Sequence, residues 1–187
     1  MLITSLLFTF VKKALKRDIF KAVNLGALKP TGKNILISRN QTSGEIAGAI
    51  VKAIEESKAS AQEIAPYLKG STKRQTAKNI WLFTKKVIPY RKESENYQTA
   101  KTLPRILGDI NTTGGDCKHY SIAIASLLKA SEIPCKLRLV SQRMFSSSPN
   151  HIYVVALING EEFVLDCCLK QFDTECSYYK KYDIKVK

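Results

Sequence analysis

Three observations in the sequence predict an α+β fold. Apolar residues recur at helical spacing in three segments of the chain. Strand-like runs follow in the second half, and an Asn-Gly pair joins the last two of them. We therefore expect an antiparallel sheet packed against a helix, with further helices before it. The helical segments are 45–58, 72–88 and 117–130, and the strand-like runs are 136–141, 151–158 and 162–167.

The chain is long enough for one well-buried core, since 44% of its 187 residues are hydrophobic. We expect an N-terminal helical extension over residues 1–70 and a main domain over residues 71–187. Pro66 and Gly70 interrupt the helical pattern before that boundary. A short strand-like run at 34–37 lies within the extension.

The helix expected at 72–88 takes Ser71 as its N-cap and ends before Pro89. Its apolar positions place Trp81 in the core. The helix at 117–130 has the more regular apolar face, with Asp116 as a natural N-cap. It therefore begins at or beside Cys117.

A cysteine at a helix N-terminus is a candidate nucleophile, because that position stabilises a thiolate. Gly114 and Gly115 permit a tight turn that brings backbone close to a substrate carbonyl. Unpaired amides of the first helical turn, near Gly115 and Asp116, would form an oxyanion site. Gln98 is a further candidate oxyanion or substrate-contact residue, and its alternative role is an ordinary exposed loop amide.

Strand geometry places a histidine and an aspartate together downstream of Cys117. If Asn159-Gly160 forms a two-residue type I′ turn, Ile158 pairs with Glu161. His151 and Asp166 then share one face of the hairpin as diagonal neighbours, about 7–8 Å apart at Cα. His119 should project from another side of its helix, and we expect it at the surface or hydrogen-bonded.

The ordered motifs resemble the transglutaminase-like branch of the papain-type cysteine peptidase fold. The resemblance rests on Gly-Gly-Asp-Cys before a helix, then His-Ile-Tyr-Val and Val-Leu-Asp on strands, and it covers about residues 81–166. It implies a papain/transglutaminase-like domain in which Cys117 is the nucleophile, His151 the general base and acid, and Asp166 the group that orients His151. The short chain and its C-terminal tail are also similar to small bacteriophage members of this group.

The five cysteines favour neither a metal site nor a disulfide framework. The chain has no Cys-x-x-Cys pair and only two histidines, so the usual zinc spacings are absent. An odd number of cysteines favours a reducing compartment. We expect no metal and no cofactor, and we note Cys168 as a second thiol on the His151 face.

The strong positive charge of the chain favours anionic partners. Thirty Lys and Arg against sixteen Asp and Glu give a net charge of +14. Phosphate backbones, anionic membranes and acidic cell-wall polymers would all be attracted, but no nucleic-acid readout motif is present. Non-specific polyanion binding is therefore one expectation, and a solvated basic face is its plainer alternative.

Residues 1–20 combine a short apolar run with four basic residues. The eleven residues of that run are too few to span a bilayer as a helix. They also lack the preceding basic segment and the cleavage site of a signal peptide. We expect a helix that packs on the domain, with attachment to a partner chain, a virion or a membrane surface as alternatives. The expected location is cytoplasmic or virion-associated.

The residues thus predict a cysteine-dependent acyl-transfer enzyme. It would cleave or transfer a peptide or protein amide, with a cell-wall peptide among the candidate substrates, through a thioester on Cys117. Hydrolysis ranks before transamidation because it needs only water. The alternative is a catalytically silent transglutaminase-like structural or virion protein that binds through its basic surface and N-terminal helix.

Overall fold

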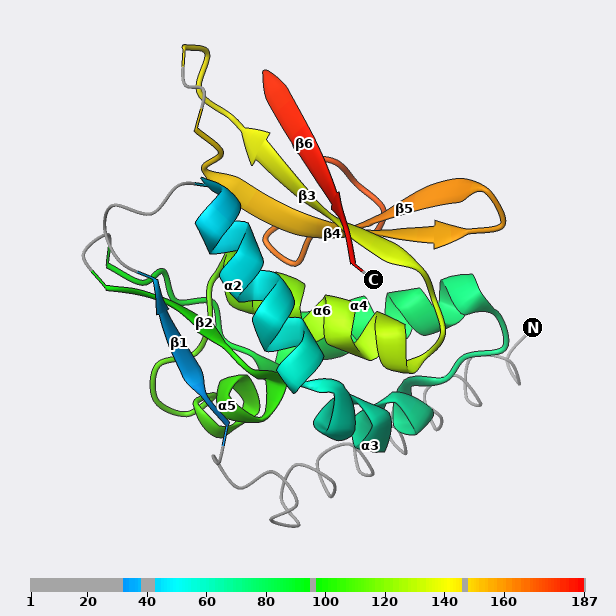
Figure 1. The fold of residues 1–187 in the computed structure, drawn as a ribbon. Helices are drawn as coiled ribbons and strands as arrows, with labels where there is room; N and C mark the ends of the chain where they lie inside the picture. The colour runs from blue at the N-terminus through cyan, green and yellow to red at the C-terminus, as the bar shows by residue number, and fades with distance from the viewer. Residues whose placement is uncertain (1–31, 38–42, 95–96, 146–147, 187) are drawn as a thin grey trace.

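The computed structural model describes residues 32–37, 43–94, 97–145 and 148–186 (Figure 1). The expectations for residues 1–20 lie outside the described residues. No helix in the described part of the chain is long and apolar enough to cross a membrane. The chain forms two antiparallel sheets and a group of helices, as the predicted α+β class requires.

The larger sheet has four strands in the order β5-β4-β3-β6, and all neighbouring pairs are antiparallel. The smaller sheet pairs β1 with β2. The strands are β1 (Asn34–Ile37), β2 (Gln98–Lys101), β3 (Cys135–Ser141), β4 (His151–Ile158), β5 (Glu161–Leu165) and β6 (Lys180–Lys185).

The helix α6 lies at the centre of the fold, between the four-stranded sheet and the other helices (Figure 1). Every residue from 118 to 128 of this helix is buried, so it has no solvent-facing side over that length. The helices are α2 (Ser43–Glu56), α3 (Lys58–Leu68), α4 (Lys73–Val87), α5 (Leu103–Gly108) and α6 (Cys117–Ala130).

One apolar core joins these layers. Ile50 of α2 and Leu68 of α3 belong to the same buried cluster as Leu127 of α6 and Val154 of β4. The predicted division at residue 70 stays a prediction, but α2 and α3 share their core with the sheet-bearing half of the chain.

The predicted hairpin register is confirmed. Ile158 pairs with Glu161, and both Asn159 (φ 54°) and Gly160 (φ 84°) adopt positive φ, as a type I′ turn demands. The bounds expected for α6 and β4 also match the structure. The inward face of the hairpin is therefore the one that the sequence predicted.

Several elements differ from the prediction. The helix α3 continues through Pro66, which was expected to interrupt it, and Thr72 rather than Ser71 caps α4 by accepting from the Gln75 N–H. The helix tolerates Pro66 in its last turn, because it ends two residues later at Leu68 and little of it follows the missing N–H. Gln98 begins a strand and does not lie in a loop.

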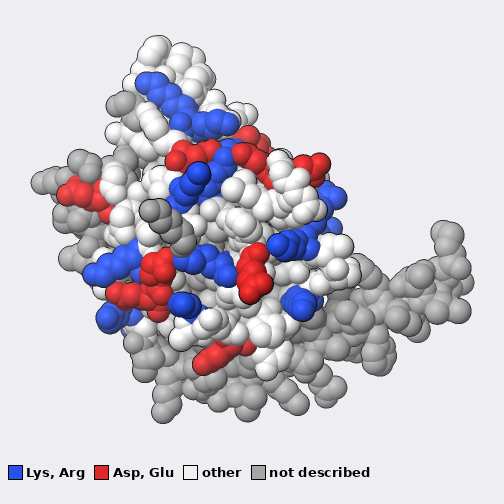
Figure 2. All heavy atoms as spheres, turned by 45° about the vertical axis from the view of Figure 1, so that its right-hand side comes forward, with Lys and Arg blue, Asp and Glu red and all other residues white. Residues whose placement is uncertain are grey.

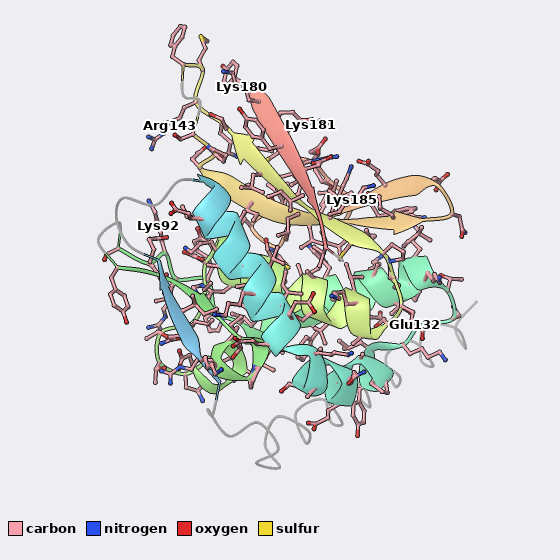
Figure 3. All side chains as sticks on the ribbon, in the orientation of Figure 1. Lys92, Glu132, Arg143, Lys180, Lys181 and Lys185 are labelled. Atoms are coloured by element: carbon pink, nitrogen blue, oxygen red, sulfur yellow. The ribbon has the colours of Figure 1, made fainter. Side chains whose placement is uncertain are left out.

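Exposed charge covers the edge of the larger sheet. Figure 3 shows Lys180 and Lys181 towards one end of β6 and Lys185 towards the other. The face in Figure 2 carries Lys and Arg interleaved with Asp and Glu. Arg138 of β3 illustrates this mixing, because its buried guanidinium pairs with Asp183, Glu175 and Glu162. The positive excess is thus interrupted by carboxylates on this face.

Candidate active site

Cys117 is the first residue of α6 and is half-buried. The turn before it is fixed to the segment that follows α4, since the Gly115 N–H donates to the Pro89 carbonyl (3.0 Å) and the Arg91 N–H donates to the Gly115 carbonyl (2.9 Å). Gly114 has a positive φ of 57°, and a Cβ there would lie 2.4 Å from the Pro89 oxygen. Only glycine fits this close approach.

His151 and Asp166 form a hydrogen-bonded pair across the hairpin. The His151 Nε2 lies 2.7 Å from the Asp166 Oδ2, and both side chains are largely shielded, with 11% and 2% of their surface exposed. The structure therefore brings together the two residues that the strand register placed on one face.

Four hydrogen bonds hold Asp166 and the residues just after it in place. The Trp81 indole N–H donates to its backbone carbonyl (3.0 Å), and the Cys168 N–H donates to its Oδ1 (2.9 Å). The Lys85 ammonium donates to the carbonyls of Cys167 (2.7 Å) and Leu169 (2.5 Å) just beyond it. The helix α4 thus fixes the loop that presents the carboxylate, and Trp81 is buried as expected.

The charge state of His151 depends on its two partners. Burial alone would lower its pKa, but side-chain hydrogen bonds to Asp166 and to Cys117 raise the pKa to about 9. The Asp166 bond uses Nε2, which leaves Nδ1 for the thiol. We refer to Cys117, His151 and Asp166 as the thiol cluster.

Fewer backbone N–H groups are unpaired at the start of α6 than the sequence predicted. The Gly115 N–H is bonded to Pro89, and the Asp116 N–H donates to the His119 Nδ1 (3.1 Å). The Asp116 carboxylate accepts from the Lys118 and His119 N–H groups in a capping box. Within the described part of the chain, these bonds leave the Cys117 N–H as the first-turn amide without a hydrogen-bond acceptor.

A second polar cluster, Glu93, Asp116, Lys118 and His119, lies behind the helix start and was not predicted. We call it the cap cluster. The Lys118 ammonium pairs with Asp116 and lies 3.8 Å from the Glu93 Oε2. Although burial would raise the pKa of Asp116, the hydrogen bond from His119 and the charge of Lys118 hold it well below its usual range. No sequence signal marks Lys118 as buried, since lysine is normally exposed.

Two predicted residues face the cap cluster. Gln98 accepts from the Lys118 ammonium (2.6 Å) and donates to the Ser94 carbonyl (2.8 Å), so its role as an oxyanion residue stays a prediction. His119 is fully buried and hydrogen-bonded, and its Nε2 lies 3.3 Å from the Thr99 Oγ1. The sequence predicted His119 either at the surface or in a hydrogen bond, and the structure shows the hydrogen bond.

A cleft of about 540 Å³ opens next to Cys168, whose thiol lies within 4.8 Å of the facing His151 and Asp166 atoms, although no residue of the thiol cluster lines it. Tyr90 stands at its edge with 53% of its surface exposed. Burial, followed by the negative charges of Cys168 and Cys117, raises the pKa of Tyr90 to about 12. Its phenol therefore stays protonated near the thiol. The cleft is lined by Lys86, Ile88, Pro89, Tyr90, Tyr120 and Cys168, together with Lys85 and Cys167.

The remaining thiols differ in access. Cys135 and Cys167 are buried, and burial raises the pKa of Cys135 to about 12. Cys168 is exposed, and desolvation together with the Asp166 charge raises its pKa as well. Cys168 lies within 4.8 Å of His151 and Asp166, atom to atom, and these three residues could hold a metal ion. Glu93, Asp116 and His119 form a second such group, but Lys118 already occupies its carboxylates.

Comparison with known proteins gives one family. The sequence profile described as "Transglutaminase-like domain" matches residues 59–187. No curated protein matches the chain. Among solved structures, the chain is similar to a candidate protease from Parabacteroides distasonis, with 14% identity and a TM-score of 0.49, over 65% of this chain and 26% of that one. It is also similar to a candidate cysteine protease from Cytophaga hutchinsonii, with 13% identity and a TM-score of 0.42, over 72% and 48%. The chain thus spans at most about half the length of these structures.

Proposed function

Because this chain belongs to the transglutaminase-like domain family, we propose that it is a cysteine-dependent acyl-transfer enzyme that acts on a peptide or protein amide. Cys117 is the nucleophile, His151 the general base and acid, and Asp166 the residue that orients His151. The observation that carries the proposal is the 2.7 Å bond between His151 and Asp166, together with the side-chain hydrogen bond between the same imidazole and Cys117.

In the first half-reaction the Cys117 sulfur attacks the amide carbonyl and forms a carbon–sulfur bond. His151 accepts the thiol proton as the carbon–sulfur bond forms, and its raised pKa favours the resulting imidazolium. The carbon–nitrogen bond then breaks, and His151 transfers its proton to the departing amine. A thioester on Cys117 and a free amine result.

In the second half-reaction a water molecule or an amine attacks the thioester. His151, now neutral, accepts the proton of the attacking group and returns it to the Cys117 sulfur as the carbon–sulfur bond breaks. Water gives a carboxylic acid and an amine gives a new amide. We place hydrolysis first, since it needs no acceptor other than water.

The negative oxygen that develops in each half-reaction needs a donor. The Cys117 N–H at the start of α6 is suited to this, because the helix dipole adds positive potential there. The phenol of Tyr90 is a second donor near the thiol. Gly115 and Gln98 use their N–H groups elsewhere, so we assign them to the support of the site.

The test is direct detection of the thioester. The full chain would be mixed with a panel of peptide amides and peptide 4-nitrophenyl esters, quenched in acid and measured by intact-mass spectrometry. We expect an acyl adduct on Cys117 that hydroxylamine removes. Cys117→Ala should form no adduct, and Cys176→Ala is the matched control for loss of a half-buried thiol elsewhere. Equal turnover by Cys117→Ala and the wild type would overturn the proposal.

A further inference from the structure

The cleft beside Cys117 has a chemical character of its own. Two lysines line it, and no acidic side chain of the described residues does. A cleft with one sign of charge and low-dielectric walls concentrates the opposite charge. This positive potential would attract a negatively charged part of a substrate.

The cleft lies close to the residues of the thiol cluster. Tyr120 forms one wall and lies one helical turn after Cys117 on α6. Cys168 forms another part and lies within 4.8 Å of His151 and Asp166, atom to atom. A substrate residue in the cleft would therefore neighbour the amide that Cys117 attacks.

The ammonium groups of the two lysines differ in their hydrogen bonding and exposure. The Lys85 ammonium is held by the carbonyls of Cys167 and Leu169, so it is a fixed structural charge. Lys86 is exposed, and among the described residues no carboxylate lies within ion-pair distance of it. Lys86 is thus the charge that is available to a ligand.

The other walls are apolar. Ile88 and Tyr120 are buried beneath the cleft, and Pro89 and the ring of Tyr90 form its edge. The Tyr90 and Tyr120 rings lie 5.8 Å apart, centroid to centroid. Such a surface accepts the methylene groups of a side chain while a cation binds its charged end.

We propose that this cleft is an anionic subsite, which binds a carboxylate-bearing residue of the substrate next to the scissile amide, and that Lys86 determines this specificity. The inference rests on the proposed acyl-transfer function of Cys117. It names the substrate class as acidic peptides, whether the carboxylate comes from a side chain or from a chain terminus.

The experiment uses three affinity labels that differ in charge. They are the chloromethyl ketones of benzyloxycarbonyl-glutamate, -glutamine and -lysine, and the rate of alkylation at Cys117 is read by peptide mass spectrometry. Iodoacetamide, which has no side chain, reports separately whether Cys117 is activated by His151. Two competitors distinguish a side-chain carboxylate from a terminal one: N-acyl glutamate α-amide carries only the first, and N-acyl glutamine carries only the second.

The variants are Lys86→Glu and Lys86→Gln, with Lys78→Glu as the matched control. Lys78 is an exposed lysine on the same helix, about 12 Å along the axis, and it does not line the cleft. We expect the wild type to prefer the glutamate label over the lysine label. Lys86→Glu should lower that preference at least about tenfold at low ionic strength, because each contact between charges in a solvated cleft is worth roughly a factor of five. Lys86→Gln should lie between, and Lys78→Glu should behave like the wild type.

Equal rates for the three labels, or a preference that Lys86→Glu leaves unchanged, would overturn the anionic subsite while Cys117 remains activated. Slow iodoacetamide labelling that His151→Ala does not alter would instead overturn the acyl-transfer function, and this inference with it.

Discussion

The thiol cluster and the cap cluster adjoin the same helix start, and they have one feature in common. Each contains a histidine and a carboxylate in close contact. His151 has 11% of its side chain exposed and adjoins Cys117, whereas His119 is fully buried with its Nδ1 bonded to a backbone N–H. A histidine paired with a carboxylate is therefore not reactive for that reason alone. What distinguishes the two is whether solvent reaches the ring and whether one ring nitrogen stays free for the thiol.

The largest expected effect compares the two histidines. His151→Gln should slow thioester formation on Cys117 by about 10²–10⁴-fold, since it removes the general base and acid. His119→Gln should slow it by less than about tenfold and lower the free energy of unfolding by about 1–3 kcal/mol, since it leaves buried donors unpaired. Stopped-flow acylation and urea unfolding measure the two quantities. Similar losses of rate in both variants would remove the distinction between the clusters.

The next effect concerns the stability that the cap cluster provides. Asp116→Ala leaves the Lys118 ammonium, with 9% of its side chain exposed, without its nearest carboxylate and removes the N-cap of α6. We expect a loss of about 3–5 kcal/mol in the free energy of unfolding. The double variant Asp116→Ala, Lys118→Met should recover part of it, because the unpaired charge is gone. A single variant as stable as the wild type in urea would contradict this account.

A smaller effect tests how α4 supports the thiol cluster. Trp81→Phe removes the donor to the Asp166 carbonyl, and we expect about 1–2 kcal/mol of lost stability together with a several-fold slower acylation. Phe83→Leu is the matched control, as it perturbs another buried aromatic residue of α4. It should lower stability without slowing acylation relative to the wild type. Equal kinetic effects would show that Trp81 acts through packing alone.

The last expected effect is the pH dependence of stability. The pKa of His151 is raised from 6.5 to about 9 in the folded state. Its contribution to stability is therefore fully present below about pH 6.5 and is lost as the pH rises through about 9. His151→Gln should show a shallower decline than the wild type over this window in urea unfolding. Parallel curves for the two proteins would mean that folding does not raise the pKa of His151.

The helix start at Cys117 and the pairing of His151 with Asp166 could be predicted because each followed from a local rule, whereas the association of Cys117 with that pair was implied by the family resemblance. Asp116 before an amphipathic stretch placed Cys117 at a helix start, and Asn159-Gly160 set the register that joins His151 to Asp166. These signals lie within a few residues of the features they predict.

The missed parts depend on distant contacts. The strand β6 shows a short alternation in which Tyr182 and Ile184 are separated by Asp183, but its place in the sheet depends on the distant strand β3, where Arg138 pairs with Asp183. The strand β2 forms against β1, which lies more than sixty residues earlier in the chain. The burial of Lys118 likewise arises from Glu93 and Gln98, which tertiary packing brings to it. Composition and periodicity carry no record of such contacts.

The pH dependence of iodoacetamide labelling at Cys117 tests the central claim most directly. Peptide mass spectrometry would give the rate for the wild type, His151→Ala and His119→Ala. An activated pair predicts fast labelling that persists well below pH 8, is lost in His151→Ala and is largely retained in His119→Ala. Labelling that rises only near pH 8.5, alike in all three proteins, would contradict the account and mark Cys117 as an ordinary thiol.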